Sequence, residues 1–337
     1  MDLTTAPIDV TSLCDAIAAA SVVIPVGART QWEVGGLPHA SGTEVRAPCG
    51  IVAYDPADLT VTVGCGTPVR DLEAVLGEHG QECGLDPRDD AATVGGVLAT
   101  GLSGPRRLRY GPLRDTVLEV RFVTGDGRLV KGGGPTVKNV TGYDLPRLLV
   151  GSFGSLGVLT QVTLRCRPRP AEHTWFVSDR PAADLIGALY RPSCVASDGT
   201  RAYVLLEGHG VDVATQSEGA SLSATTPVSL PVGAHRGRLA VAPARLDAVG
   251  RALGAIDGCR WLAEYGVGTV HVAGDDAAVL IAARGVAHAH GGWLLREAGG
   301  DDGFDGFGVA LPNPDLHRRI KEAFDPEGKC NPGRLPT

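Results

Sequence analysis

The spacing of apolar residues along the first 170 positions predicts short strands that alternate with short helices. Val69, Leu72 and Leu76 recur at the period of a helix and fall on one of its faces. Thr67 stands just before them, where a capping residue is expected. Gly125-Asp126-Gly127 separates two apolar runs, which is typical of a hairpin turn. The predicted helices cover 12–20, 67–79 and 145–150, and the predicted strands cover 22–26, 51–55, 60–64, 116–124, 128–131 and 158–165.

This pattern breaks at Arg167-Pro168-Arg169-Pro170, which predicts the main domain boundary. Beyond it, strands and helices alternate again, as expected for two helices packed on a small antiparallel sheet. Residues 86–111 and 208–231 are rich in small and polar side chains, have no clear period and are expected to be loops. No internal repeat of fixed period is apparent. The predicted strands of this part cover 174–177, 202–207, 237–241, 268–272 and 293–297, and its predicted helices cover 182–190, 243–256 and 275–288.

Composition and charge exclude several classes of protein. Of the 337 residues, 43% are hydrophobic and 20% are charged, which is ordinary for a globular protein and argues against disorder. The net charge is -7 and the basic residues form no block, so neither nucleic acid nor an anionic membrane is an expected partner. The longest apolar stretches are too short and interrupted to insert into a bilayer. The first residues lack the positive charge of an export signal, so we expect a cytoplasmic protein.

The cysteines and histidines do not form a metal-binding pattern. Eight cysteines are scattered along the chain without any Cys-x-x-Cys pair, so neither an iron–sulfur cluster nor a structural zinc is expected. His288 and His290 point to different sides of a helix at this spacing, which favours a polar helix end over a metal site. No histidine stands in a setting that marks it as a general base. The catalytic residues therefore stay unassigned.

Three glycine-rich segments are candidates for holding a long, phosphate-containing cofactor. Backbone without side chains lets N–H groups approach a pyrophosphate closely. None of the segments reads G-x-G-x-x-G between a strand and a helix, so a Rossmann nucleotide site is not supported. On the residues alone, each segment is either a phosphate cradle or an ordinary turn. The three segments cover 25–30, 93–111 and 151–157.

Taken in order, the motifs of residues 22–165 resemble the FAD-binding domain of the vanillyl-alcohol oxidase/p-cresol methylhydroxylase (PCMH-type) superfamily. Residues 25–30 lie where this family has its first pyrophosphate loop. Residues 92–101, Ala-Thr-Val-Gly-Gly-Val-Leu-Ala-Thr-Gly, resemble its principal flavin loop, and residues 151–160 resemble a later glycine-rich segment. Several ordered motifs over this length are more specific than any one of them.

The resemblance implies one FAD, bound non-covalently because the first loop has no His or Cys suited to flavin attachment. Ala28 and Arg29 replace two of the glycines that this loop usually carries. The pyrophosphate is expected along the backbone N–H groups of 27–30 and 95–96, with 157–158 near the flavin. The residues implied to bind the cofactor are Val26, Gly27, Ala28, Arg29, Thr30, Thr93, Val94, Gly95, Gly96, Ala99, Ser103, Tyr110, Gly111, Gly157 and Val158.

Further motifs at 103–107, 138–145, 261–266 and 324–334 resemble one branch, the FAD-binding subunits of bacterial glycolate oxidases. The resemblance implies an α+β fold, with a PCMH-type FAD-binding domain of two subdomains over 1–170 and a smaller, ferredoxin-like cap domain over 171–310. A C-terminal tail over 311–337 is expected to return to the FAD domain.

By the same resemblance, the chain would work with a second flavoprotein subunit and an iron–sulfur subunit. It would oxidise a small 2-hydroxy acid, glycolate to glyoxylate, or relay its electrons. Two alternatives stay open: a standalone FAD-dependent oxidoreductase of another alcohol or hydroxy acid, and a non-catalytic flavin-binding interaction subunit.

Charged and polar residues near these motifs have open roles. A basic cluster either stabilises reduced flavin, anchors a substrate carboxylate or pairs with surface acids. A second group either supports the flavin or contacts a partner subunit, and two tail residues either close over the cofactor or dock the C-terminus. The basic cluster is Arg106, Arg107, Arg109 and Arg114. The second group is Lys138, Asn139 and Tyr143, and the two tail residues are Asn331 and Arg334.

Overall fold

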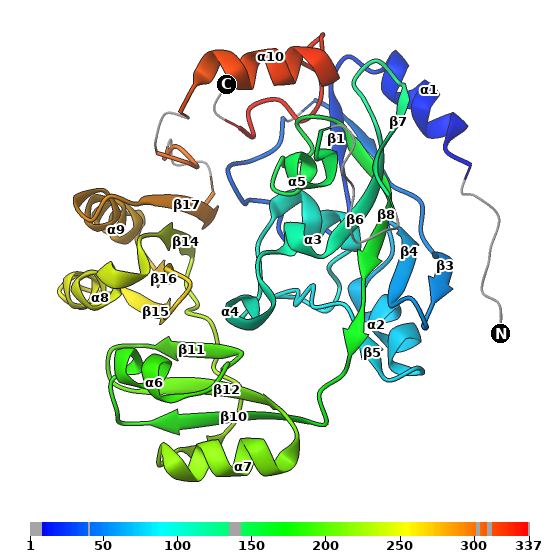
Figure 1. Cartoon of the computed structure of the whole chain (residues 1–337). Coiled ribbons are helices and arrows are strands. Elements are labelled where there is room, and N and C mark those ends of the chain that lie inside the picture. Colours follow the sequence, from blue (N-terminus) through cyan, green and yellow to red (C-terminus); the bar gives the residue numbers. More distant parts are fainter. Residues whose placement is uncertain (1–8, 40, 135–142, 301–303, 309–311, 336–337) are drawn as a thin grey trace.

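The computed structural model describes residues 9–39, 41–134, 143–300, 304–308 and 312–335 (Figure 1). Lys138 and Asn139 lie outside these described residues. Two halves face each other: β1–β9 with α1–α5 and α10 form one, and β10–β17 with α6–α9 form the other. Both helices and antiparallel sheets occur in each half. The predicted α+β fold class is therefore confirmed.

A five-stranded antiparallel sheet is the centre of the first half. Val69, Leu72 and Leu76 of α2 (Val69–Gly77) pack on it as their spacing predicts, together with Val97 of α3 (Val94–Thr100) and Leu149 of α5 (Leu145–Leu149). The strands, in spatial order, are β3 (Ile51–Asp55), β4 (Thr60–Gly64), β8 (Val158–Arg165), β6 (Val117–Val123) and β7 (Leu129–Gly133).

Smaller elements complete this half. Two parallel strands, residues 23–25 and 43–45, form a separate pair beside the main sheet. An antiparallel pair joins residues 81–82 to residues 167–168. The remaining elements are α1 (Thr11–Ala19), β1 (Val23–Pro25), β2 (Thr43–Val45), β5 (Gln81–Glu82), α4 (Arg107–Tyr110), a 3-10 turn (Leu113–Asp115), β9 (Arg167–Pro168) and α10 (Pro314–Phe324).

The expectation that 86–111 is entirely loop was wrong. Val94, Val97 and Leu98 lie at helical spacing and are fully buried in α3, although glycines and threonines surround them. Thr67 does not cap α2 either. Pro68 holds the cap position, and the Thr67 hydroxyl accepts a hydrogen bond from the N–H of Gly50 at 2.8 Å.

The second half is an eight-stranded antiparallel sheet built from two units of the same topology. Each unit runs βαββαβ: β10-α6-β11-β12-α7-β13 and then β14-α8-β15-β16-α9-β17. The strand order is β13-β10-β12-β11 in the first unit and β15-β16-β14-β17 in the second, so the two ferredoxin-like units join edge to edge through β11 and β15. Their bounds are β10 (Glu172–Ser178), α6 (Ala182–Ala188), β11 (Cys194–Ser197), β12 (Ala202–Gly208), α7 (Gly210–Gly219), β13 (Ser223–Thr225), β14 (His235–Ala240), α8 (Leu246–Gly254), β15 (Arg260–Glu264), β16 (Thr269–Gly274), α9 (Ala277–Ala289) and β17 (Trp293–Ala298).

This duplication corrects three expectations. The sheet carries four helices, whereas two were expected to pack on it and three helical ranges were predicted. The segment 208–231 contains α7 and β13, and β11 and β15 were missed. A repeat is present in the topology, although the residues show no fixed period. Sequence patterning detects a repeat only when equivalent positions keep similar residues, whereas the topology needs only the same order of elements.

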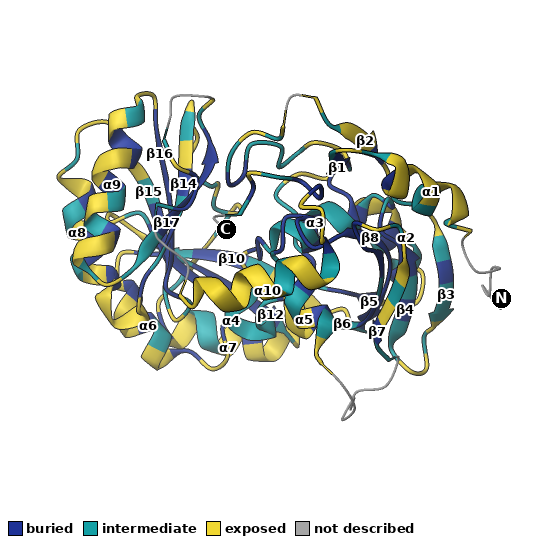
Figure 2. Cartoon of the chain, turned by 90° about the horizontal axis from the view of Figure 1, so that it is seen from above, coloured by how far each residue is buried: buried dark blue, intermediate teal, exposed yellow. Residues whose placement is uncertain are grey.

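The two faces of this sheet differ in chemistry. On the second unit, Leu239, Val270 and Leu294 pack with α8 and α9 on one face. Figure 1 shows these helices on the side away from the first half, and Figure 2 shows their exposed outer surfaces over buried strands. Side chains alternate along a strand, so the neighbouring residues face the first half. Arg238 and His271 are among them.

The C-terminal segment after α10 lies beside β1. Cys330 forms a parallel bridge with Val23, whose N–H donates to the carbonyl of Lys329 at 2.8 Å. Asp325, which is buried, accepts hydrogen bonds from the N–H groups of Lys329 and Cys330. The bounds 1–170, 171–310 and 311–337 stay predictions of the sequence. In the described parts of the chain, no helix combines the length and apolar character needed to cross a membrane.

Candidate functional site

Two adjoining cavities form a groove between β1, α3 and the 152–158 segment. Both are lined by Pro25, Gly27, Thr93 and Gly96. Most of the residues predicted to bind the cofactor gather here. Those that line the groove are Val26, Gly27, Ala28, Arg29, Thr30, Thr93, Gly95, Gly96, Ala99, Gly157 and Val158.

The first loop supplies the free hydrogen-bond donors of this groove. Within the described residues, the backbone N–H groups of residues 27–30 donate no hydrogen bond. A row of free N–H groups on one turn suits an anionic pyrophosphate. By contrast, the N–H of Gly95 donates to the carbonyl of Cys65 at 2.7 Å, and that of Gly96 donates to Thr93 Oγ1 at 3.2 Å. Gly95 and Gly96 therefore contribute close approach of the backbone rather than donors.

Ala28 and Arg29, which replace two glycines, leave the backbone N–H donors of this loop free among the described residues. Arg29 adopts a left-handed conformation, with φ 60°, and its guanidinium pairs with Glu44 and stacks on Trp32 at 4.7 Å. Its side chain is thus held by contacts with Glu44 and Trp32, while its N–H remains available. The glycine replacements leave the backbone donors in place.

The C-terminal tail borders the same groove. Asn331 Nδ2 donates to the carbonyl of Phe153 at 2.5 Å, while the buried Asn331 Oδ1 has no hydrogen-bond partner among the described residues. Arg334 lies buried beside it and donates to the carbonyls of Trp32 and Val34, and burial lowers its pKa to about 10. Arg334 docks the tail, and Asn331 offers an unused acceptor to a hydroxyl-bearing ligand.

The groove leads into two further cavities between the halves. A cavity of about 220 Å³ shares Thr100 and Phe153 with the groove and is closed from the opposite sheet by Arg238 and Trp293. It shares Ser103 with a cavity of about 430 Å³. We refer to these as the ring cavity and the inner cavity. One end of this succession of spaces is lined by glycine-rich backbone, and the other end is lined by residues of both halves. Such an extended arrangement suits a long dinucleotide.

Arg238 is a buried cation in the ring cavity. Its side chain is 13% exposed, and its ion-pair partner among the described residues is Glu297 at 3.9 Å. Burial lowers the pKa of Arg238 to about 10, because a weakly paired guanidinium loses its hydration. Arg107 and Arg114 also line this cavity, as the sequence allowed. A cation here is placed to stabilise negative charge on a bound ring.

Arg106 and Arg109 instead join the two halves. Arg106 pairs with Glu82 at 2.7 Å, with Asp86, and with Glu207 of the second half at 3.3 Å. Burial alone would lower the pKa of Arg106, but the hydrogen bonds and charges of Asp86 and Glu82 raise it above its usual value. Arg109 donates to the carbonyl of Glu207 at 2.6 Å. For these two arginines, pairing with acidic and carbonyl groups is the observed role.

Four predicted cofactor residues, Val94, Ser103, Tyr110 and Gly111, lie outside the groove. The Arg167 guanidinium lies over the ring of Tyr110 at 3.9 Å, and Gly111 forms the following turn with φ 81°. Val94 is buried at the start of α3. Ser103 lines the ring and inner cavities. Tyr143 is 91% exposed and lines none of these cavities.

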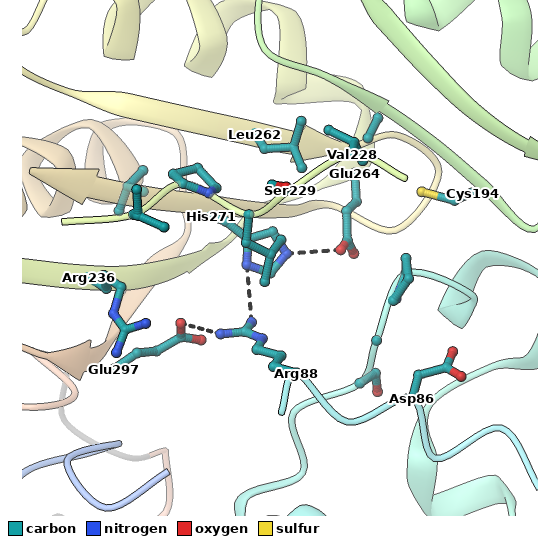
Figure 3. A pocket seen from close by; sticks show the side chains of 18 of the residues that line it. Asp86, Arg88, Cys194, Val228, Ser229, Arg236, Leu262, Glu264, His271 and Glu297 are labelled. Carbon is teal, nitrogen blue, oxygen red and sulfur yellow. Dashed lines mark hydrogen bonds and ion pairs between the residues drawn. The ribbon is translucent and has the colours of Figure 1, made fainter. Parts of the chain in front are cut away.

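The inner cavity holds a chain of four ionisable groups, shown in Figure 3. His271 Nε2 lies 2.9 Å from Glu264 Oε1, and His271 Nδ1 lies 3.1 Å from Arg88 Nη2. Arg88 also pairs with Glu297. A guanidinium can only donate, so Nδ1 accepts from Arg88 and Nε2–H donates to Glu264. The geometry fixes the tautomer of His271.

His271 is the functional candidate that the sequence analysis missed. It is 4% exposed and lies between Val270 and Val272, which face the apolar core of the second unit. A polar residue at the alternate position of an otherwise apolar strand was the available signal. Its partners could not be found in the same way, because Arg88 is distant in sequence.

Comparisons with known proteins identify the cofactor class. Residues 3–133 match the family described as FAD binding domain, and the predicted FAD cofactor is confirmed. The chain is 48% identical to the glycolate oxidase subunit GlcE of Escherichia coli over 129 residues, which are 38% of this chain and 37% of that protein. The predicted resemblance to the PCMH-type FAD-binding superfamily and its glycolate oxidase branch is thereby confirmed.

More distant relatives support the same fold. The D-lactate dehydrogenase of Archaeoglobus fulgidus is 41% identical over 155 residues, 45% of this chain and 35% of that protein. The solved structure of Physcomitrella patens BBE-like 1 superposes with a TM-score of 0.69 at 15% identity, covering 97% of this chain and 89% of that one. The matched segments thus span about a third of the curated Escherichia coli and Archaeoglobus fulgidus proteins.

Proposed function

We propose that this chain is an FAD-dependent oxidoreductase that oxidises a small 2-hydroxy acid, with its FAD held non-covalently. The observation that carries the proposal is His271, placed with Glu264 and Arg88 in the inner cavity that adjoins the ring cavity at Ser103. A base and a guanidinium beside the flavin are the groups that oxidation of a hydroxy acid requires.

The pyrophosphate would lie against the N–H groups of residues 27–30, and the ring would enter the cavity between Ser103 and Arg238. Bound FAD supplies the acceptor for the hydride that leaves the substrate carbon. Removal of this hydride and of the hydroxyl proton together turns the alcohol into a carbonyl group.

His271 would receive the hydroxyl proton. Its Nδ1 is occupied by the N–H of Arg88, so it becomes available once Arg88 turns to a substrate carboxylate. A carboxylate competes well for this donor because a guanidinium binds it through two parallel hydrogen bonds. Glu264 holds the ring in orientation through Nε2–H and stabilises the positive charge that protonation creates.

We further propose that the chain acts in the cytoplasm as one subunit of a glycolate oxidase complex. The similarity to a protein named as a glycolate oxidase subunit supports this assignment. The partners would be a second flavoprotein subunit and an iron–sulfur subunit, to which electrons from the reduced flavin pass. Turnover by this chain with no partner would favour a standalone oxidoreductase instead.

The test is the visible spectrum of the purified chain under anaerobic conditions, before and after addition of glycolate, D-lactate or longer 2-hydroxy acids. We expect a flavin spectrum that bleaches, and FAD in the supernatant after denaturation. Bound FAD that no 2-hydroxy acid reduces would contradict the catalytic role. It would leave the chain a flavin-binding interaction subunit.

A further inference from the structure

The inner cavity is larger than glycolate needs. Its volume of about 430 Å³ lies within the range of roughly 300–1,000 Å³ typical of sites that enclose drug-sized ligands. Glycolate is the smallest 2-hydroxy acid and has no side chain to fill such a space. The excess volume therefore calls for a substrate with further atoms.

One end of this cavity is cationic. Arg88 is 21% exposed and holds His271 and Glu297, and Arg236 lines the same end. Within the described part of the chain, the Arg236 guanidinium makes no hydrogen bond or ion pair. Figure 3 shows Arg236 on the same side as Glu297 and Arg88. This end suits a carboxylate, which two guanidinium groups recognise well.

The other end is apolar. Cys194 and Ala196 of β11 and Leu262 of β15 form its floor, each at most 3% exposed, and the 226–234 loop covers them with Val228 and Leu230. Apolar lining gains free energy when a ligand displaces water from it, in proportion to the apolar area covered. A substrate without a side chain would leave this surface uncovered.

The reactive group lies between the two ends. Figure 3 shows His271 and Glu264 with Arg88 and Glu297 on one side and Leu262 and Val228 on the other. A 2-hydroxy acid carries its hydroxyl on the carbon that joins the carboxylate to the side chain. The order of groups along the cavity therefore matches the order of groups along such a molecule.

We infer that the preferred substrate is a 2-hydroxy acid with an apolar side chain, its carboxylate at Arg88 and Arg236 and its side chain over Cys194, Ala196 and Leu262. This inference rests on the proposed function and assigns the substrate class of the same site. It predicts that glycolate reduces the flavin of this chain less efficiently than such acids do, also within the proposed complex.

The experiment compares anaerobic flavin reduction of the FAD-loaded chain by glycolate, lactate, 2-hydroxybutanoate and 2-hydroxyoctanoate. We expect the rate constant divided by the apparent Kd to rise at least about tenfold from glycolate to 2-hydroxyoctanoate. Val228→Trp fills the apolar end from the loop, so it should lower the 2-hydroxyoctanoate response at least about tenfold more than the glycolate response. The matched control is Val211→Trp on α7, 79% exposed and outside the cavity, which should change neither.

Binding of non-oxidisable carboxylates gives a second readout that does not depend on turnover. Octanoate should perturb the flavin spectrum at lower concentration than acetate does, and Val228→Trp should abolish that difference. A flavin reduced best by glycolate, with no effect of Val228→Trp, would overturn the substrate class and leave the proposed function standing. A flavin that no acid reduces would contradict the proposed function. In that case, equal binding of acetate and octanoate would overturn the apolar specificity as well.

Discussion

Arg238 and His271 are directly paired residues of the neighbouring antiparallel strands β14 and β16. Arg238 lines the ring cavity and His271 lines the inner cavity, so this one pair lies at the junction of the two spaces. Because side chains alternate along a strand, a slip of either strand by one residue would turn its member of this pair into the apolar core. The register of β14 and β16 thus determines whether Arg238 and His271 face the cavities between the two halves.

Replacing His271 by Gln should slow anaerobic flavin reduction by about 10²–10⁴-fold, which is the usual contribution of a general base. FAD binding should stay unchanged, because His271 lies outside the groove that we propose for the pyrophosphate. His271→Ala should regain part of its activity when imidazole is added. Stopped-flow absorbance measures both effects, and an unchanged rate in His271→Gln would exclude the base.

Replacing Arg238 by Met should make the midpoint potential of the bound flavin more negative. The buried cation stabilises the extra negative charge of the reduced ring, and for a two-electron couple about 30 mV corresponds to ~1.4 kcal/mol. We expect a shift of tens of millivolts, measured by dye-coupled redox titration. Arg128→Met, in the exposed turn between β6 and β7, is the control and should leave the potential unchanged. A potential that is the same in Arg238→Met would place the ring elsewhere.

Replacing Gly27 by Ala should weaken FAD binding about tenfold or more. The added Cβ would overlap Thr93 Oγ1, which caps α3 by accepting from the N–H of Gly96. Loss of such a cap costs about 1 kcal/mol, and the displaced side chain narrows the groove. Gly187→Ala on α6, where a Cβ meets no atom, is the matched control. Titration of the apoprotein with FAD, followed by fluorescence, should show full affinity for the control alone.

Glu207 should stabilise the contact between the two halves of the molecule in a pH-dependent way. Burial alone would raise its pKa, but hydrogen bonds with His173 and Ser193 and the charge of Arg106 lower it to about 2, from 4.5 in the unfolded chain. The stabilisation is therefore complete above about pH 4.5 and is lost as the pH falls through about 2. It amounts to roughly 3 kcal/mol at neutral pH, from ~1.4 kcal/mol for each pKa unit.

Urea unfolding of Glu207→Gln measures this contribution. At pH 7 the variant should have a lower free energy of unfolding by roughly 3 kcal/mol, and the difference from the wild type should shrink as the pH falls below 4.5. Glu78→Gln, at an exposed position at the end of α2, should show no difference at either pH. A difference that is constant with pH would mean that the Glu207 charge does not contribute.

The sequence predicted the groove well because its parts are local. Glycine-rich turns such as 25–30 and 151–157 keep their residues together in the chain, so their order alone indicates a cofactor-binding loop. Arg88 and Glu297, in contrast, meet across 209 positions, and the ion pair Arg106–Glu207 joins the two halves. Such contacts depend on how two sheets are placed, which no local pattern records.

The second half shows the same limit. β16 alternates polar and apolar residues over Thr269–Val272 and was predicted, whereas β11 (Cys-Val-Ala-Ser) and β15 (Arg-Trp-Leu-Ala-Glu) show no such alternation and were missed. Without these two strands, the edge at which the two duplicated units join could not be predicted. The inner cavity lies on that edge, so its floor was missed with it.

The most direct test of the account is a crystal structure of the chain saturated with FAD. We predict the pyrophosphate against the N–H groups of residues 27–30 and the flavin ring between Ser103 and Arg238, with its reactive face open to the cavity that holds His271. A ring that lies outside this cavity, or a pyrophosphate that is bound elsewhere, would contradict the proposed site and the catalytic role of His271.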